Sequence, residues 1–248
     1  MNGVLIVTGG SRGIGAATAR LAAMQGWDVC VGYRAEASAA AEVVDGCKAR
    51  GGKALAVRTD VSIEADVVRL FETADAELGP VRGLVNNAGI VDLQSRVEDM
   101  SGEGIQRMLA VKVLGSFLCA REEVREMSPA HGGAGGAIVN VSSRAAVLGA
   151  PGEYVDYAAS KAAVDALTVG LAREVAANGI RVNGVRAGLI DTTIHADGGE
   201  PGRVARLAST VPMQRGGRPE EVAEAILWLL SPAASYVTGS TVDVAGGR

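Results

Sequence analysis

The sequence of 248 residues has few cysteines, few aromatic residues and no long apolar runs. Its three cysteines, Cys30, Cys47 and Cys119, lie far apart without a CxxC spacing, so we expect free thiols in a reducing compartment and a cytoplasmic protein. The longest apolar runs, such as 4–7 and 223–230, fall well short of the roughly 20 residues that span a bilayer, so no membrane segment is expected. The segment MNGVLIVTGG lacks the basic region of a signal peptide.

An excess of charge of one sign is also missing. The net charge is −4 and the basic residues are scattered, which excludes the basic stripe of a nucleic-acid-binding protein. Aromatic residues make up 3% of the chain, which argues against a sugar-binding platform of stacked rings. The two histidines show no metal-ligand spacing, so no metal site is expected. We expect His131 at the surface, whereas His195 either contacts substrate or lies in an ordinary loop.

Short β-branched apolar runs alternate along the chain with longer amphipathic stretches, a pattern typical of βαβ units. This alternation predicts a single-domain α/β fold of the Rossmann type over residues 1–248, because parallel strands need crossover connections. We expect a doubly wound parallel sheet of seven strands with helices on both faces, built from two halves at about 1–135 and about 136–248. The predicted strands are 4–8, 28–33, 53–58, 83–87, 137–142, 181–185 and 241–244, and the predicted helices are 13–25, 35–50, 63–78, 102–127 and 157–178.

A glycine-rich turn, TGGSRGIG at residues 8–15, follows the first predicted strand and opens a helix. Small residues there let the backbone approach a pyrophosphate, and a helix N-terminus offers free N–H groups and a positive dipole end. The GxxxGxG spacing therefore favours dinucleotide binding, with a plain tight turn as the alternative. The ATP-binding pattern GxxxxGK[ST] is absent.

The end of the second predicted strand indicates which dinucleotide is bound. An acidic residue at this place would bind the ribose hydroxyls of NAD and repel the extra phosphate of NADP. The chain instead has Tyr33 and Arg34, with no carboxylate before Glu36, and Arg12 lies in the glycine turn. Two guanidinium groups suit a phosphate, so we expect NADP(H), with NAD(H) as an alternative. The other interpretation is that both arginines are solvated surface residues that bind no cofactor.

A tyrosine and a lysine four residues apart, Tyr157 and Lys161, open the last long predicted helix and share one of its faces. A free phenol has a pKa of about 10, and lowering it by ~3 units needs ~4 kcal/mol of stabilisation from nearby cations. Upstream, the predicted strand ending at Ser142 and Ser143 points its carboxyl end at the ligand crevice. Ser143 either polarises a substrate oxygen or only caps the next turn. Asn87 to Gly89 and Asp60 to Val61 follow two other predicted strands and are expected beside the cofactor.

Taken together, these motifs resemble those of the short-chain dehydrogenase/reductase (SDR) family over nearly the whole chain. The matching stretches are TGGSRGIG at 8–15, TDVS at 59–62, NNAG at 86–89, VNVSS at 139–143, YAASK at 157–161, GIRVNGV at 179–185 and YVTGSTVDVAGG at 236–247. The chain looks similar to glucose-dehydrogenase-like and 3-oxoacyl-reductase-like bacterial members without an assigned substrate.

The resemblance implies a function for each matching residue. Tyr157 would be the general acid/base, Lys161 would bind the nicotinamide ribose and tune Tyr157, and Ser143 would polarise the carbonyl. The family is usually tetrameric, and here the helices around 111–118 and 164–171 and the C-terminal tail would form the interfaces, with a homodimer as the alternative. The cofactor would be lined by Gly9, Ser11, Arg12, Gly13, Ile14, Gly15, Arg34, Asp60, Val61, Asn87, Ala88, Gly89, Tyr157 and Lys161, with Ile190 and Thr192 at the nicotinamide carboxamide.

The chain departs from the family pattern at three places. Lys112 occupies the position of an asparagine that holds a water in a proton relay, so that relay is altered or absent. Ala187 stands where a proline usually precedes Gly188, which makes the turn less rigid. Ser143 and Tyr157 are 14 residues apart, one more than in many members, and we place the extra residue in 151–154.

The leading hypothesis is an oxidoreductase that transfers hydride between NADP(H) and a small-molecule carbonyl or secondary alcohol. The alternatives are a non-catalytic dinucleotide-binding partner protein and a reaction without net cofactor turnover, such as dehalogenation or isomerisation. Residues 195–201 form either a mobile lid or an ordinary loop, residues 121–126 are read as a solvated helix face, and Trp228 is expected in the core. An apolar substrate pocket is expected from Val91, Leu93, Ala145, Leu148, Ala150, Tyr154, Leu189 and Ile194.

Overall fold

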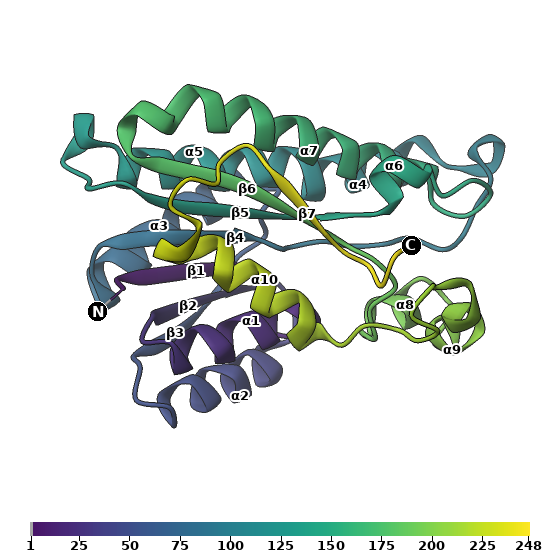
Figure 1. Ribbon diagram of the computed structural model, residues 1–248, viewed down its shortest axis with the longest axis horizontal. Helices are drawn as coiled ribbons and strands as arrows, with labels where there is room; N and C mark the ends of the chain where they lie inside the picture. The colour runs from purple at the N-terminus through teal and green to yellow at the C-terminus, as the bar shows by residue number, and fades with distance from the viewer. Residues whose placement is uncertain (1) are drawn as a thin grey trace.

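One parallel sheet of seven strands organises the fold in the computed structural model, which describes residues 2–248 (Figure 1). The strand order is β3-β2-β1-β4-β5-β6-β7, and every neighbouring pair is parallel, which confirms the predicted doubly wound sheet. The order reverses at β1 and β4, the point at which such sheets bind ligands. The strands are β1 (Val4–Thr8), β2 (Asp28–Tyr33), β3 (Ala54–Arg58), β4 (Val81–Asn86), β5 (Gly136–Ser143), β6 (Ile180–Ala187) and β7 (Thr241–Val244).

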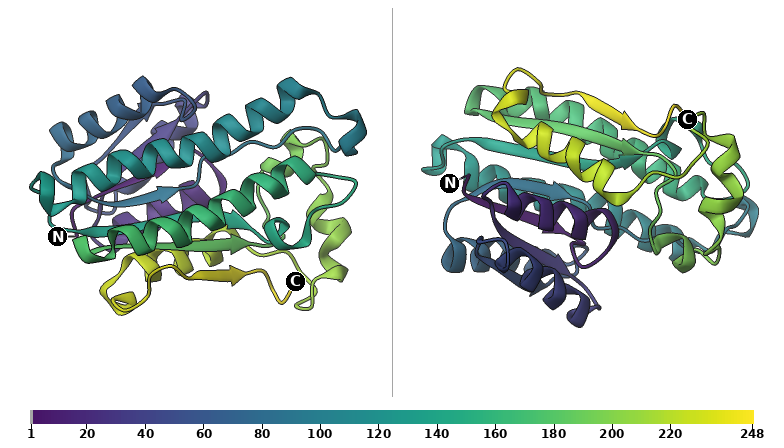
Figure 2. Two further views of the ribbon diagram at one scale, coloured as in Figure 1. Left: turned by 90° about the horizontal axis from the view of Figure 1, so that it is seen from above. Right: turned by 60° about the horizontal axis from the view of Figure 1, so that its bottom comes forward.

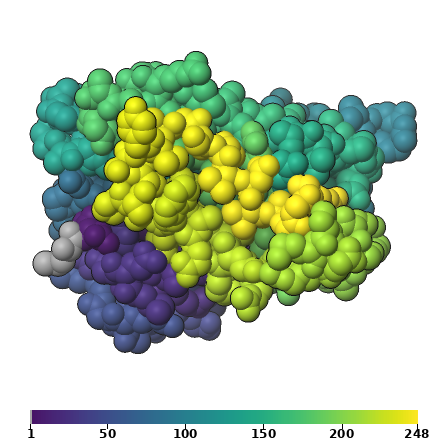
Figure 3. Space-filling model, in the orientation of Figure 1, coloured from purple at the N-terminus to yellow at the C-terminus, as the bar shows by residue number. Residues whose placement is uncertain are grey.

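Long helices cover both faces of the sheet, as predicted (Figures 1 and 2). One face carries α1 (Gly13–Met24), α2 (Ala37–Lys48) and α10 (Pro219–Leu230), and the other carries α3 (Glu64–Leu78), α5 (Gly115–Met127) and α7 (Val155–Val175). The shorter helices are α4 (Gly102–Leu109), α6 (Ala145–Leu148), α8 (Ile194–Asp197) and α9 (Arg203–Leu207). The space-filling view shows α8 and α9 as a bulge beside the C-terminal end of the chain (Figure 3).

Strand β1 shows how the sequence builds a core on each face. Successive side chains of a strand point to opposite faces, so Leu5 and Val7 pack among the helices of one face and Val4 and Ile6 among those of the other. All four are fully or almost fully buried, and each such side chain contributes roughly 1.5–3 kcal/mol. A continuous apolar run, rather than an alternating one, is therefore what this central strand requires.

The predicted element boundaries agree closely with the structure, but four helices were not predicted. Three predicted strands coincide with β1, β2 and β7, and the other four differ by one or two residues at one end or at both. The missed helices are α6, α8, α9 and α10. Helix α10 carries readable signals, with Pro219 at its first position and Glu220 and Glu221 in its first turn. Residues 195–201, predicted as a lid or loop, include most of α8.

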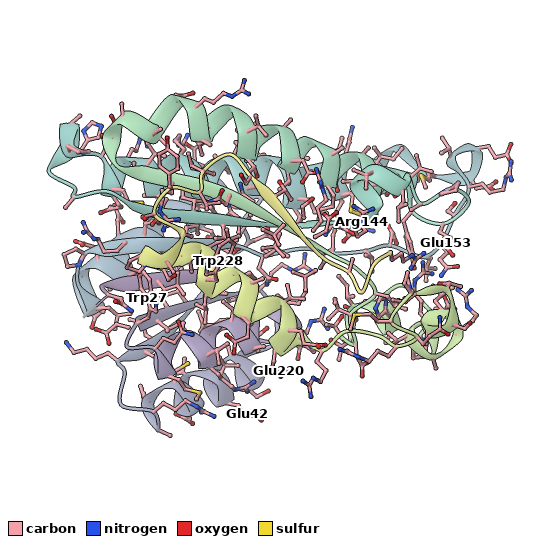
Figure 4. The ribbon with its side chains drawn as sticks, in the orientation of Figure 1. Trp27, Glu42, Arg144, Glu153, Glu220 and Trp228 are labelled. Carbon is pink, nitrogen blue, oxygen red and sulfur yellow. The ribbon has the colours of Figure 1, made fainter. Side chains whose placement is uncertain are left out.

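Three expectations about helices were wrong in detail. Trp228 is not in the core: it is 43% exposed, because it lies on the side of α10 opposite Ile226 (Figure 4). The run 121–126 is not wholly solvated, since Glu123 on α5 is fully buried. The predicted helix 102–127 is interrupted by a π-helical segment, Ala110–Leu114, between α4 and α5. Inserted π turns of this kind are frequent at functional sites.

Candidate active site

A cavity of about 560 Å³ lies at the carboxyl ends of the strands, within the size range of sites for small ligands and cofactors. It brings together nearly all the predicted site residues; Gly15 is the one that does not line it. The predicted residues that line the cavity are Gly9, Ser11, Arg12, Gly13, Ile14, Arg34, Asp60, Val61, Asn87, Ala88, Gly89, Ser143, Tyr157, Lys161, Ile190 and Thr192.

The turn between β1 and α1 has the geometry of a phosphate cradle. Gly9 and Gly13 have φ values of +61° and +55°, a conformation that favours glycine. Helix α1 begins at Gly13 with no acidic residue in its first turn and no side chain capping it. Its first N–H groups are therefore available to an anion, and the residues present fit a dinucleotide pyrophosphate.

Asn87 fixes this turn against the end of β4. Its side-chain amide donates to the carbonyl oxygens of Thr8 at 2.9 Å and Gly9 at 3.0 Å. Its backbone N–H donates to the Thr8 hydroxyl at 3.0 Å, and that hydroxyl donates in turn to the Val85 carbonyl. A methyl group on Gly15 would lie 2.5 Å from both the Gly9 oxygen and the Asn87 amide nitrogen. The absence of a side chain at Gly15 therefore allows α1 to pack closely against this turn.

Three charged residues predicted beside the cofactor, Arg34, Asp60 and Arg12, line the cavity, and two of them already have partners. Arg34 forms no salt bridge within residues 2–248. Asp60 accepts hydrogen bonds from the Ser62 N–H and hydroxyl, which orders the turn after β3. Arg12, the second predicted phosphate ligand, lines the cavity but forms a salt bridge with Asp197 of α8. Of the arginines that line the cavity, Arg34 is thus the one without a salt bridge in the part of the chain that the structure describes.

Ser143, Tyr157 and Lys161 reach the same cavity from two adjacent elements. Ser143 ends β5, and Tyr157 and Lys161 occupy one face of the first turns of α7. Lys161 is buried, and its ammonium donates to the carbonyl oxygen of Val141. Burial lowers the pKa of Lys161 to about 8, and the carboxylate of Asp165 opposes that shift.

The phenol of Tyr157 does not show the pKa decrease expected from the sequence. Burial raises the pKa of Tyr157 above its ordinary value, and a hydrogen bond with Ser143 acts in the opposite direction. The reason is that desolvation disfavours the phenolate more than the single hydroxyl stabilises it. A lower phenol pKa requires positive charge close to the ring.

The sequence did not predict where the side chain of Lys112 lies. This lysine belongs to the π-helical segment, is 1% exposed and lines the cavity. Its Nζ lies 4.5 Å from the centroid of the Tyr157 ring, closer than the Nζ of Lys161 at 5.9 Å. The departure from the family pattern thus places a second amino group beside the phenol.

The substrate side of the cavity is more polar than expected. Of the apolar residues predicted to line it, Val91 and Ile194 do so, joined by His195 and Arg107. The others do not line it: Leu93 and Leu148 are exposed, the Tyr154 hydroxyl donates to the Gly198 carbonyl, Leu189 lines a separate cavity of about 120 Å³, and Ala145 and Ala150 lie outside both. Arg107, paired with Asp92, carries no signal in the sequence that sets it apart from other surface arginines.

The two other departures from the family pattern have local structural consequences. The turn after β6 lacks a proline, yet the N–H of Gly188 donates to Val244 and the carbonyl of Ala187 accepts from Arg144. The segment 151–154 contributes Glu153, which is labelled in Figure 4. This carboxylate forms a salt bridge with Arg203 of α9. The ring of Tyr154 stacks 5.4 Å from that same guanidinium.

Comparison with known proteins identifies the family. Residues 9–248 match the family model described as enoyl-(acyl carrier protein) reductase. A short-chain type dehydrogenase/reductase from Mycobacterium marinum superposes with a TM-score of 0.89 at 37% identity, covering 98% of this chain and 94% of that one. The chain belongs to the short-chain dehydrogenase/reductase family.

Similar proteins match nearly the full length of the chain. The uncharacterised oxidoreductase YgfF of Escherichia coli is 57% identical over 245 residues, 99% of each chain. The cis-4-hydroxycyclohexanecarboxylate dehydrogenase of Sinomonas cyclohexanicum is 44% identical over 98% of this chain and 95% of its own. The 3β-hydroxysteroid dehydrogenase 1 of Eggerthella lenta is 40% identical over 98% and 92%. The chain is therefore an SDR oxidoreductase, and the family implies a nicotinamide dinucleotide as cofactor. In residues 2–248 no helix is long and apolar enough to cross a membrane.

Proposed function

We propose that this SDR transfers hydride between NADP(H) and a small-molecule ketone or secondary alcohol. The observation that carries the proposal is the convergence of Ser143, Tyr157 and Lys161 on the cavity that also receives the uncapped N-terminus of α1. A binding protein without catalysis needs the glycine turn alone. It has no physical need for a phenol, an ammonium and a hydroxyl gathered at one place.

Each of the three side chains has a distinct task in this proposal. The nicotinamide, when bound, supplies or accepts the hydride. Tyr157 gives a proton to the substrate oxygen during reduction and removes it during oxidation. Ser143 donates a hydrogen bond to that oxygen as negative charge develops. Lys161 holds the nicotinamide ribose and favours the phenolate through its charge.

The cofactor is assigned to residues from both halves of the chain. The half at about 1–135 supplies the pyrophosphate cradle and the adenosine end, and the half at 136–248 supplies the reacting groups and the carboxamide contacts of Ile190 and Thr192. NADP(H) is favoured over NAD(H) because Arg34 faces the cavity without a salt-bridge partner in the described chain. Glu36 also lines this end, and it opposes the preference.

The substrate and the assembly complete the proposal. Two relatives are named as dehydrogenases of a hydroxycyclohexane carboxylate and a hydroxysteroid, so cyclic secondary alcohols and ketones are the first compounds to test. A homotetramer is supported by exposed apolar side chains on the helices predicted as interfaces, such as Leu114, Phe117 and Val169.

The decisive experiment incubates the protein with NADPH or NADH and a panel of cyclic and acyclic ketones. Loss of nicotinamide absorbance, faster with NADPH, is the expected result. Tight NADPH binding without turnover on any compound would instead indicate a non-catalytic partner protein. Product formation without net loss of cofactor would indicate an isomerisation or elimination. Sedimentation velocity on the same sample tests the tetramer.

A further inference from the structure

Lys112 is a buried amino group that the proposed reaction does not use. It is 1% exposed, and its Nζ approaches so near Gly89 that a methyl group built there would lie 2.4 Å away. Within residues 2–248, no carboxylate forms a salt bridge with it. Burying an ammonium without a carboxylate costs several kcal/mol, so the position is not explained by stability.

The local backbone explains how the side chain reaches the cavity. Lys112 is the middle residue of the π-helical segment Ala110–Leu114, which packs against α4, α5 and α7. The Ser116 hydroxyl donates to the Lys112 carbonyl at 2.7 Å, a bond that holds this turn in place. An insertion of this kind rotates the residues around it relative to a regular helix. Here it places an amino group over the face of the Tyr157 ring.

The charges around the two amino groups differ. Burial and the ammonium of Lys161 lower the pKa of Lys112, whereas the carboxylate of Asp156 raises it; both charged residues belong to α7. Lys161 in turn has Asp165 and the Val141 carbonyl to stabilise its charge. Lys112 therefore has the less favourable surroundings for an ammonium, unless another negative charge forms beside it.

Two other polar side chains that line the cavity, Arg107 and His195, already have partners. Arg107 of α4 is paired with Asp92, and His195 hydrogen-bonds through Nε2 with the Ile190 carbonyl at 2.8 Å. Glu123 of α5 is buried but does not line the cavity, and burial raises its pKa well above its usual value, which favours the neutral acid. Besides the carboxylate of Asp156, the group beside Lys112 that can become negative is the phenol of Tyr157, whose ring centroid lies 4.5 Å from the Lys112 Nζ.

Resting on the proposed function, we propose that Lys112 is a positioning residue for Tyr157, whose ammonium pairs with the phenolate that remains after the phenol has given its proton to the substrate oxygen. The phenol O–H bond breaks, the substrate oxygen gains the proton, and the negative charge on Tyr157 faces the positive charge on Lys112. In alcohol oxidation the phenolate takes the proton of the alcohol, and Lys112 keeps its own proton throughout.

The pKa directions agree with two buried groups that stabilise each other as ions. Burial and the charge of Lys161 place the pKa of Lys112 well below 10.5, and burial raises the pKa of Tyr157. Each group is thus disfavoured as an isolated ion. A phenolate and an ammonium side by side carry no net charge, so each stabilises the other. This pairing gives the cavity a source of positive charge in addition to Lys161.

The test titrates Tyr157 in the protein without cofactor or substrate. Tyrosinate absorbance is followed with rising pH in the parent protein, in Lys112→Met and in the surface control Lys53→Met, and the matched Tyr157→Phe curve is subtracted from each. We expect Lys112→Met to raise the midpoint for Tyr157 by about one pH unit or more, and Lys53→Met to leave it unchanged. Equal midpoints in all three proteins would overturn the pairing.

Two further measurements keep the result clear. Methionine retains the length of the side chain and removes a buried charge, so the unfolding midpoint should stay the same or rise. If Lys112→Met does not fold, Lys112→Gln is titrated in its place, with the same expected shift. Because the titration needs no turnover, a protein that shows the shift but never consumes NADPH refutes the proposed function and not the pairing. Turnover with unshifted midpoints refutes the pairing alone.

Discussion

Replacing Gly15 with alanine tests whether the cradle depends on the close approach of helix α1 to the loop after β4. Alanine is normally favoured over glycine in a helix by about 1 kcal/mol. Here its methyl group would lie 2.5 Å from the Gly9 oxygen, 2.5 Å from the Asn87 amide nitrogen and 2.9 Å from the Gly10 Cα. Two of these three atoms belong to the backbone, so the turn itself must move.

The expected loss follows from the contacts at risk. Moving the Asn87 amide breaks its hydrogen bonds to the carbonyl oxygens of Thr8 and Gly9, worth about 2 kcal/mol together, and overpacking adds roughly 1–3 kcal/mol. After the helix gain of about 1 kcal/mol, Gly15→Ala should lower the free energy of unfolding by about 2–4 kcal/mol. It should also weaken dinucleotide binding, because the N–H groups of α1 shift with the turn.

The assay measures urea unfolding without ligand and dinucleotide affinity by calorimetry. Gly102→Ala is the matched control, since Gly102 is also in the first turn of a helix but has no atom within 4 Å of its added methyl group. The control should be neutral or slightly stabilising. If Gly15→Ala matched it in both stability and affinity, the steric reasoning about the cradle would be refuted.

Three other substitutions test the site and the fold. Tyr157→Phe should reduce turnover roughly 10²-fold or more while leaving the dinucleotide Kd unchanged; full activity would exclude the phenol as acid/base. Arg34→Ser should lower the ratio of kcat/KM for NADPH over NADH by about 10-fold or more, because a charge-assisted hydrogen bond is lost, and an unchanged ratio would assign the preference elsewhere. Burial raises the pKa of Glu123 well above 4.5, so the fold retains a proton that the unfolded chain releases. Stability should therefore fall as pH rises above 4.5 towards the folded pKa, by up to about 1.4 kcal/mol per unit, and unfolding at several pH values should show no such contribution in Glu123→Gln.

The architecture was predictable from the sequence because buried parallel strands leave a plain signal. Apolar runs such as 4–8 need no partner information to be recognised, and the glycine turn marks the first crossover. The orientation of the helices was less predictable from the sequence. Trp228 and Glu123 were misplaced because a run of similar residues does not reveal which side of a helix meets the sheet. That information lies in the packing of neighbouring helices.

The site residues were predictable as types and positions, and their interactions were not. Spacing placed Tyr157 and Lys161 on one helical face, and both line the cavity. No pattern in the sequence indicated that Arg12 pairs with Asp197, 185 residues away, or that a π-helical turn brings Lys112 to the phenol. Such contacts depend on how distant segments meet, so they become visible only in three dimensions.

The salt bridges around Arg203 join three segments that are remote in sequence. Its guanidinium binds Glu153 before α7 and Glu200 before α9, and Gln94 after β4 also donates to Glu200. A side chain exchanged in any one of these segments changes the charge balance of the other two. The three segments are therefore held together through their side chains, and exchanging any one of them calls for changes made jointly in the other two.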